Sequence, residues 1–322
     1  MKVYVRTPAR LHFGFIDMRG DLGRFFGGLG VAIDKPNVVL EVQPSESFSV
    51  TGKETDRATM FARRFLETYE IDGGFNIHVE QTIPEHVGLG SGTQLALAIA
   101  AALARLFKVT VPIPELSLSM ERIKRTGVGT AVFEQGGFVV DGGKKMKNKV
   151  IIPQGLPPLI FRRSFPNNWK FVVAIPPVEK GLSRNEEKEA FDRISPMPTE
   201  VVGKICRLIM MQLLPSLIDR DIHNFGDALT QIQVTVGKYF ADVQGGIFSS
   251  SIAASGINFM KDHGAYGVGQ SSWGPTVYGL VEGKKQARNL QSELENFLRK
   301  DGYNGKVFIA NPNNCGAIVK QV

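Results

Sequence analysis

The sequence predicts an α+β protein of two domains. Its 322 residues, 43% hydrophobic and 21% charged, are typical of an ordinary globular chain and suffice for one large or two medium domains. Short segments of alternating apolar and polar residues, typical of strands, are interspersed with longer segments of helical spacing. A stretch rich in proline and basic residues between 153 and 166 divides the chain, so we place the domains at residues 1–160 and 161–322.

The charge and cysteine content narrow the class of protein. The net charge is +7, but the cations are dispersed, apart from a lysine-rich run at 144–149 that we interpret as a solvated loop. A nucleic-acid-binding protein usually clusters its cations, so the charge suits a small acidic substrate better. Cys206 and Cys315 are too few for a disulfide framework and fit a reducing cytosol. We find no apolar run of transmembrane length and no signal peptide, so we expect a cytoplasmic protein without a membrane partner.

Residues 2–7 alternate as a strand, and a glycine-rich segment at 7–30 follows, which we interpret as a loop. Its phenylalanines should draw the loop inward together with its charges. Those charged side chains are Arg10, His12, Asp17, Arg19, Asp21 and Arg24. Because buried charges need partners or a ligand, the segment is a candidate site.

Each type of side chain in this segment has its own chemistry. Arg10, Arg19 and Arg24 present forked donors that match a phosphate or a carboxylate. The sequence does not show which arginine binds which anion. Asp17 is the first candidate to hold Mg²⁺ or to orient an arginine. The unperturbed pKa of a histidine lies near neutrality, so His12 could shuttle a proton, or it could simply be a packed histidine.

The next segments are assigned by periodicity. Strands are predicted at 31–34, 37–43 and 75–80, the last with His78 facing outward. A helix is predicted at 57–69, with an aromatic stripe, and another begins at 112 and extends toward 125.

The loop at 83–94 and the helix after it carry the strongest signal. Residues 95–107 are rich in alanine and leucine and apolar nearly all round, which predicts a buried helix. Ser91 and Thr93 could cap it. Glycines let backbone N–H groups approach a ligand, and a helix N-terminus attracts anions, so we predict a phosphate site. The residues assigned to it are Gly88, Leu89, Gly90, Ser91, Gly92 and Thr93. The alternative is a glycine-rich turn that only caps a core helix.

The loop type is unusual. A P-loop needs a lysine before the hydroxyl residue, and the dinucleotide motif needs glycine at Thr93. The order Pro84, Gly88, Leu89, Gly90, Ser91, Gly92 instead resembles the P-x-x-x-G-L-G-S loop of the GHMP kinase superfamily. That resemblance implies an N-terminal domain like ribosomal protein S5 domain 2 and a ferredoxin-like C-terminal domain. Aligned on the glycine pair 136–137, Gly129 occupies the place of the catalytic aspartate of several of these kinases, and Glu134 is the nearest carboxylate.

The second half alternates strands and helices in the same manner. Strands are predicted at 171–175, 276–281, 306–310 and 316–320. Helices are predicted at 201–214, ended by Pro215, then from His223 and at 285–300, while the charged stretch 179–193 is a flap or an exposed helix. A glycine-rich region at 264–279 resembles the C-terminal motif of the superfamily, with Gln270, Ser271 and Ser272 in place of glycines. We assign these three side chains and Arg19 to substrate binding.

Three segments narrow the resemblance to one branch. They are residues 10–17, 133–138 and 269–275, and they resemble the β-ribofuranosylaminobenzene 5′-phosphate synthase family of methanopterin biosynthesis. That resemblance implies the joining of 4-aminobenzoate, or 4-hydroxybenzoate, to phosphoribosyl pyrophosphate with loss of CO₂ and pyrophosphate. It further implies Mg²⁺, an archaeal cytosolic setting and a homodimer. Such a reaction needs no phosphoryl-transfer base, which accounts for Gly129, and Arg10, His12, Asp17 and Arg24 are the candidate catalytic residues.

Two other functions stay open. An ATP-dependent GHMP small-molecule kinase would need Asp17 or Glu134 as a substitute base. A non-enzymatic binding protein would keep only the fold and the phosphate pocket, and the Arg/His/Asp cluster argues against it.

Overall fold

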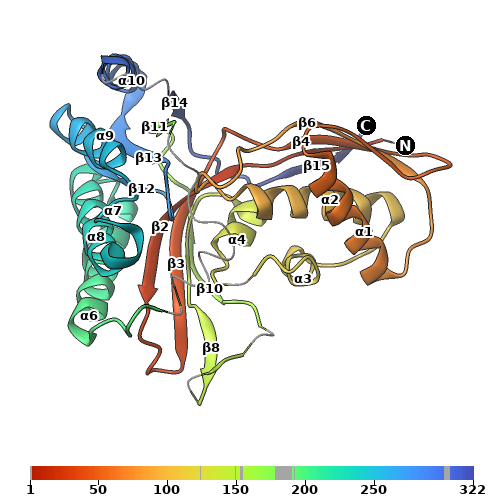
Figure 1. The fold of residues 1–322 in the computed structure, drawn as a ribbon, viewed down its shortest axis with the longest axis horizontal. Helices are drawn as coiled ribbons and strands as arrows, with labels where there is room; N and C mark the ends of the chain where they lie inside the picture. The colour runs from red at the N-terminus through yellow and green to blue at the C-terminus, as the bar shows by residue number, and fades with distance from the viewer. Residues whose placement is uncertain are drawn as a thin grey trace.

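The computed structural model describes residues 2–123, 125–148, 150–152, 155–177, 191, 193–300 and 305–322. In this part of the chain the strands form three sheets, and helices pack between and outside them (Figure 1). The predicted flap at 179–193 lies almost wholly outside the described residues. The first and second sheets belong mainly to the N-terminal half, and the third belongs to the C-terminal half.

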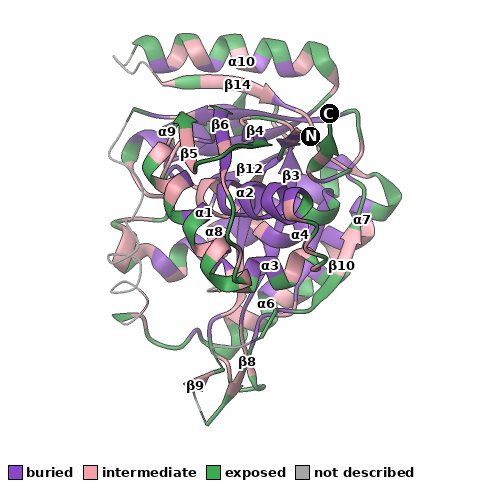
Figure 2. Cartoon of the chain, turned by 90° about the vertical axis from the view of Figure 1, so that its right-hand side faces the viewer, coloured by how far each residue is buried: buried purple, intermediate pink, exposed green. Residues whose placement is uncertain are grey.

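The first sheet carries the helix that follows the glycine-rich loop. Its strands are, in spatial order, β15 (Ile318–Gln321), β1 (Val3–Arg6), β4 (Val39–Pro44), β6 (Phe75–Gln81) and β5 (Ser49–Gly52). The helices α1 (Thr55–Tyr69) and α2 (Ser91–Phe107) contact this sheet and each other. Most of α2 is buried, as its all-round apolar sequence predicts (Figure 2). His78 is exposed on β6, also as predicted.

The second sheet is built on a long antiparallel hairpin. Its strands are β10 (Leu159–Arg163), β7 (Phe138–Asp141), β3 (Arg24–Ile33), β8 (Lys144–Lys147) and β9 (Val150–Ile151), and β2 (Ala9–Asp17) pairs with β3. The helix α4 (Val128–Gln135) contacts this sheet, and α3 (Ile113–Ser119) packs against α4 and α2. In Figure 1 the hairpin of β2 and β3 runs between these helices and those of the C-terminal half.

The prediction of a loop at 7–30 is therefore wrong. The glycines that suggested it allow close approach within the sheet, since a Cβ on Gly30 would lie 2.4 Å from the backbone oxygen of Leu11. The lysine-rich run is also misassigned in part. Lys144 begins β8, is buried, and donates from Nζ to the carbonyl of Ile123 at 3.0 Å, and burial lowers its pKa.

The third sheet has ferredoxin-like topology. Its strands lie in the order β12 (Gly267–Gln270), β13 (Val277–Glu282), β11 (Trp169–Ile175) and β14 (Lys306–Ala310), all antiparallel. The helices of this half are α6 (Thr199–Leu208), the π-helical η1 (Ile209–Leu213), α7 (Leu214–Asp219), α8 (Ile222–Gln244), α9 (Ser251–Asp262) and α10 (Gly283–Lys300). The chain thus follows the β-α-β-β-α-β pattern with the first strand central, which confirms the predicted fold.

The division between the halves is less simple than one cut. A boundary at residue 160 would fall inside β10, which pairs with β7 of the N-terminal half. After β14 the chain returns, and β15 pairs with β1. The C-terminal strand thus completes a sheet that the N-terminal strand begins.

One helical run departs from the sequence prediction. Pro215 does not end the helix, because it sits in the first turn of α7, where its missing N–H costs nothing. The run Thr199–Asp219 is long and apolar enough to cross a membrane by length and composition, contrary to our expectation. Its inward side chains, Ile205, Ile209 and Leu213, are buried and the run contacts α8, but only 33% of its apolar window is buried.

Candidate active site

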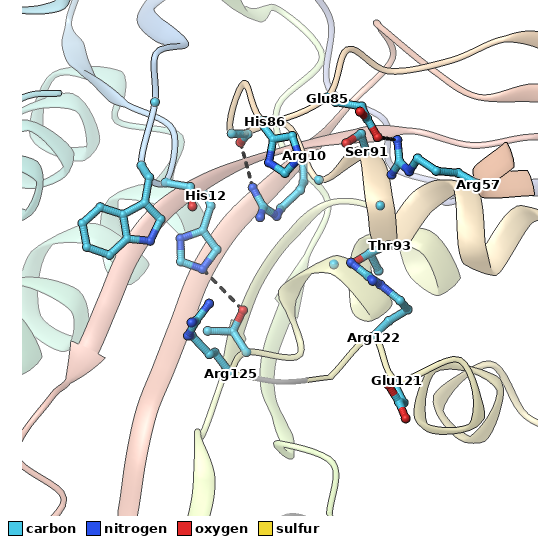
Figure 3. A pocket seen from close by; sticks show the side chains of 18 of the residues that line it. Arg10, His12, Arg57, Glu85, His86, Ser91, Thr93, Glu121, Arg122 and Arg125 are labelled. Carbon is cyan, nitrogen blue, oxygen red and sulfur yellow. Dashed lines mark hydrogen bonds and ion pairs between the residues drawn. The ribbon is translucent and has the colours of Figure 1, made fainter. Parts of the chain in front are cut away.

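A cavity of 530 Å³ opens at the N-terminus of α2. Its walls are β2, the glycine-rich loop, α1, the turn between α3 and α4, and the loop between β12 and β13 (Figure 3). The charged and histidine side chains that line it are Arg10, His12, Arg57, Glu85, His86, Glu121, Arg122 and Arg125. Four arginines against two glutamates make this a site for a polyanion.

The backbone of the glycine-rich loop packs closely against neighbouring residues at the cavity, because its glycines carry no Cβ atoms. Gly88 and Gly90 have φ of +81° and +82°, which favours glycine. A Cβ on Gly88 would lie 2.1 Å from the carbonyl oxygen of Ser271, and one on Gly90 would lie 3.0 Å from Cγ of Arg10. Arg10 holds the loop, donating from its backbone N–H to Leu89 at 3.2 Å and from Nη1 to the Gly88 carbonyl at 2.9 Å.

The N-terminus of α2 faces this cavity without a side-chain cap. Gly90 is its N-cap, so the prediction that Ser91 or Thr93 caps the helix is wrong. Ser91, Gly92 and Thr93 line the cavity instead. Because the first N–H groups of a helix lack intrahelical partners and carry partial positive charge, this end of α2 can bind an anion.

Arginines from three elements surround that helix end. A Cβ on Gly92 would lie 2.7 Å from Nη2 of Arg122 and 3.3 Å from Nη2 of Arg57, so both guanidiniums approach the first turn of α2. Arg57 forms ion pairs with Glu54 at 3.0 Å and with Glu85. Arg125 lies over the ring of Phe191 at 4.2 Å and, in Figure 3, beside His12.

His12 enters the cavity as a neutral donor. It is buried, and its pKa is lowered well below the usual value by burial and then by the charge of Arg10. Its Nδ1 accepts the N–H of Gly14 at 3.2 Å, so Nε2 carries the proton and donates to Oγ1 of Thr126 at 3.4 Å. At neutral pH this histidine can thus offer a hydrogen bond.

A buried carboxylate holds the backbone behind Thr126. Asp141 accepts N–H bonds from Gly127 and Gly143, each at 2.9 Å. Burial raises the pKa of Asp141 to about 7, although these backbone bonds act in the opposite direction. Asp141 does not line the cavity, so it positions the start of α4 without touching a ligand.

The loop after β12 fastens the two halves together at the site. Oγ of Ser271 accepts the N–H of His12 at 3.0 Å and donates to the carbonyl of Gly88 at 2.7 Å. The N–H of Ser272 donates to the carbonyl of His12 at 3.1 Å. Gln270 and Ser271 are buried behind the cavity, and Ser272 lines it.

The structure does not bring all the predicted residues together. Arg10, His12, Gly88, Gly90, Ser91, Gly92, Thr93 and Ser272 line the cavity, and Leu89 is buried beneath its loop. Asp17, Arg19 and Arg24 do not line it. Asp17 accepts the N–H groups of Arg19 at 2.7 Å and Gly20 at 3.1 Å in the turn of the hairpin. Arg19 pairs with Asp21, and Arg24 donates to the carbonyl of Gly143 at 3.0 Å.

The described residues do not build a protein site for Mg²⁺. They contain no group of three side chains able to hold a metal ion. The carboxylates that line the cavity, Glu85 and Glu121, form ion pairs with Arg57 and Arg64. Asp17, our predicted ligand, lies in the hairpin turn described above. A Mg²⁺ ion held here would share its coordination between the phosphate oxygens of a substrate and at most one or two of these side chains.

Gly129, which the superfamily resemblance aligns with the catalytic aspartate of several kinases, belongs to the cavity wall. It lines the cavity at the start of α4, and its carbonyl accepts a bond from Gln94 at 2.9 Å. A Cβ there would lie 3.0 Å from Cγ2 of Thr93. Glu134, the nearest carboxylate in sequence, is exposed and outside the cavity.

Sequence reasoning missed Arg57, Arg122, Arg125, Thr126 and Asp141. Arg57 was read only as part of a helix, and Arg122 and Arg125 only as the end of the next one. The one available signal was the pair of arginines just before the glycines at 127 and 129. Asp141 ends β7, and nothing in the sequence shows that its carboxylate is buried.

Comparison with known proteins defines first the class and then the family. Residues 56–138 match the GHMP kinases N terminal domain, and residues 213–300 match the GHMP kinases C terminal domain. Homoserine kinase from Cytophaga hutchinsonii superposes with a TM-score of 0.68 at 18% identity, covering 99% of this chain and 97% of that one. Mevalonate kinase from Methanococcus jannaschii also gives a TM-score of 0.68, at 14% identity over 97% and 98% of the two chains. The fold is that of the GHMP kinase class.

Two relatives are similar over nearly their whole length. Beta-ribofuranosylphenol 5′-phosphate synthase of Archaeoglobus fulgidus is 32% identical, with 98% of this chain and 99% of that protein covered. The protein of the same name in Methanothermobacter thermautotrophicus is 33% identical, with 99% of each covered. The chain belongs to this synthase family of the GHMP kinase superfamily. It is thus an enzyme that acts on small molecules.

Proposed function

We propose that this enzyme joins a para-substituted benzoate to phosphoribosyl pyrophosphate, with release of CO₂ and pyrophosphate. The names of its relatives support a ribofuranosylphenol phosphate product. The cavity supports a donor with anionic groups at both ends. Arg57 and Arg122 approach the end of α2, and Arg125 lies beside His12 (Figure 3).

One observation carries the choice between synthase and kinase. Four arginines and the N-terminus of α2 line the cavity, and so does Gly129, which the family resemblance aligns with the kinase aspartate. The carboxylates that do line the cavity are ion-paired, and a paired carboxylate is a poor proton acceptor. The site can therefore stabilise a departing diphosphate, whereas the described residues that line it offer an alcohol nucleophile no unpaired carboxylate as a base.

The proposed reaction needs no such base. The bond between ribose C1 and the diphosphate oxygen breaks, and its electron pair leaves with the diphosphate. The ring carbon that carries the carboxylate bonds to C1 with a pair of π electrons. The bond to the carboxylate then breaks, CO₂ leaves, and its electron pair restores the aromatic ring. Backbone N–H groups at the start of α2, together with Arg57 and Arg122, stabilise the charge that develops on the diphosphate.

The acceptor is either 4-hydroxybenzoate or 4-aminobenzoate. A ribofuranosylphenol is the product that 4-hydroxybenzoate gives, so the names of the relatives favour this acid. Neutral His12 can donate from Nε2 to a ring substituent or a carboxylate at the cavity wall. We propose 4-hydroxybenzoate first and keep 4-aminobenzoate as the second arm of the test.

The experiment combines the purified enzyme with phosphoribosyl pyrophosphate and each carboxyl-labelled acid, with and without Mg²⁺. We expect labelled CO₂ and pyrophosphate in equal amounts, without ATP. A kinase would instead turn ATP into ADP in the presence of an alcohol acceptor and leave the label in the acid. If the label stays in the acid while ATP is consumed, the synthase proposal is overturned. If neither CO₂ release nor ATP consumption occurs, the chain is a binding protein.

Further properties implied by the family resemblance are proposals as well. We propose that Mg²⁺ enters as a complex with the diphosphate, since the described residues offer it no ligand set of their own. We also propose a cytoplasmic homodimer that works in methanopterin biosynthesis. Light scattering of the purified chain tests the dimer, and omission of Mg²⁺ from the reaction tests the metal.

A further inference from the structure

A small side pocket opens beside the main cavity. Its volume is 40 Å³, and it shares His12, Phe15, Ser272 and Trp273 with the main cavity. Its other lining residues include Gln233, Val236, Phe240, Gln244, Phe248 and Gln270. The described residues that line it contain no Asp, Glu, Lys or Arg, in contrast to the arginine-rich main cavity. We call it the side niche.

Aromatic rings form the walls of the side niche where it meets the main cavity. The ring of Trp273 packs edge-on against Phe240 at 5.0 Å between centroids. Phe15 packs against Phe240 at 5.9 Å and edge-on against His12 at 5.5 Å. A flat aromatic ligand that entered between Trp273 and Phe15 would meet ring edges and faces in the geometry that aromatic pairs prefer.

Two glutamines fix the floor of the side niche. Gln233 donates to the carbonyl of Phe13 at 2.6 Å, and its Oε1 accepts the N–H of Gln270 at 2.9 Å. Gln270 donates to the carbonyl of Ser272 at 3.0 Å, and its Oε1 accepts the N–H of Ser249 at 2.7 Å. These four hydrogen bonds fix both side chains in place. Because each amide oxygen has a second lone pair, the floor can still accept a bond from a hydroxyl or an amino group.

We propose that the side niche binds the para-substituted end of the aromatic acceptor, and this proposal rests on the proposed function. The side niche has a volume of 40 Å³ against 530 Å³ for the main cavity, so it suits a hydroxyl or amino group better than the whole ring. A carboxylate would be unfavourable there, because the lining offers it no cation. The carboxyl-bearing carbon then faces the main cavity, where ribose C1 lies.

Phe15, Phe240 and Trp273 are thereby specificity-determining residues, and the niche excludes acceptors with a larger para group. Phe240→Leu tests this, because it removes ring volume from the niche wall. We measure kcat/KM for 4-hydroxybenzoate and for 4-methoxybenzoate, and KM for phosphoribosyl pyrophosphate. We expect the preference for the hydroxy acid over the methoxy acid to fall about tenfold or more. KM for phosphoribosyl pyrophosphate should change less than about twofold.

The matched control is Phe259→Leu, the same change in the same half of the chain. Phe259 lies on α9 and stacks on Phe297 at 4.4 Å, away from both cavities. We expect it to leave the preference unchanged. If Phe240→Leu does not fold, Trp273→Phe serves instead and should raise KM for the hydroxy acid about tenfold. An unaltered preference together with an unaltered acceptor KM would overturn the proposal while the proposed function stands.

Failure of the proposed function has a different signature, because wild-type enzyme would then release no CO₂ from either acid. In that case, the affinity for 4-hydroxybenzoate tests whether the side niche binds the acid. Calorimetric titration of 4-hydroxybenzoate should show about tenfold weaker affinity in Trp273→Phe than in wild type. Equal affinities, or no binding to wild type, would overturn the proposal.

Discussion

Arg122 reaches the cavity from the turn after α3, and its Nη2 comes nearest to the first turn of α2. A guanidinium in this place can donate two parallel bonds to a phosphate, and a bond to a charged group contributes about 1.5–3 kcal/mol. We expect Arg122→Ala to lower kcat/KM for phosphoribosyl pyrophosphate by about 10- to 100-fold. Arg63→Ala, an exposed arginine of α1, is the control and should change nothing. Equal kinetics in the two variants would remove Arg122 from the phosphate site.

Asp141 gives the molecule a pH dependence whose sign follows from its burial. The folded-state pKa is about 7 against 3.8 unfolded, so between about pH 4 and 7 the folded state binds more protons. The free energy of unfolding therefore falls through this window as pH rises, by up to about 4 kcal/mol from this group. His12, whose pKa is lowered, acts in the opposite direction, because protonation of the unfolded state disfavours folding below its usual pKa.

Asp141→Asn separates the effects of Asp141 and His12 on stability, because the variant loses the titrating carboxyl group and keeps the imidazole. Urea unfolding of wild type and variant at pH 5 and pH 8 gives the difference in stability at each pH. We expect wild type to lose stability relative to the variant on going to pH 8. A difference that does not vary with pH would mean that the carboxyl group titrates with an ordinary pKa.

Among the elements, the loop between β12 and β13 couples the two halves through one hydroxyl group. Ser271→Ala would leave the N–H of His12 without its buried partner, and the carbonyl of Gly88 would keep only its bond from Arg10. An unsatisfied buried polar group costs about 1–3 kcal/mol, so we expect a loss of stability of that size and weaker phosphoribosyl pyrophosphate binding. Ser272→Ala is the stability control, because its backbone bond to His12 is unaffected. Equal urea midpoints for the two variants would contradict this role.

The elements that the sequence predicted well are those with one clear periodicity. The buried helix α2 follows from its apolar positions, and the C-terminal strands follow from their alternation. The hairpin of β2 and β3 was misread because its glycines resemble a loop. They serve close packing instead, as the 2.4 Å from a Cβ on Gly30 to Leu11 shows.

The candidate site was only partly predictable for a different reason. The residues of the glycine-rich loop are consecutive in the sequence, so their pattern alone predicts a phosphate site. Arg57 comes from α1, whereas Arg122 and Arg125 come from the turn between α3 and α4, and they meet only in the folded chain. Asp17 and Arg24 belong to the same hairpin as His12, but they lie toward its turn, and nearby backbone groups satisfy them. Their predicted catalytic roles stay predictions.

At the scale of the whole molecule, the cavity is made by both halves of the chain. β2, α2 and the turn before α4 come from one half, and the loop of Ser272 and Trp273 comes from the other. A ligand that binds only the folded state stabilises all of these elements together. At about 100 times its dissociation constant it adds about 2.7 kcal/mol to the free energy of unfolding.

This coupling gives a prediction that does not depend on turnover. For a chain of 322 residues, about 2.7 kcal/mol corresponds to a rise in Tm of about 4 °C. We expect phosphoribosyl pyrophosphate to raise Tm by this amount in wild type and by much less in Arg122→Ala. Ribose 5-phosphate, which lacks the diphosphate, should have a smaller effect. Because the superfamily fold also serves ATP-dependent kinases, ATP is the decisive comparison. A larger rise with ATP than with phosphoribosyl pyrophosphate would assign the arginine-lined cavity to a nucleotide and contradict the proposed donor.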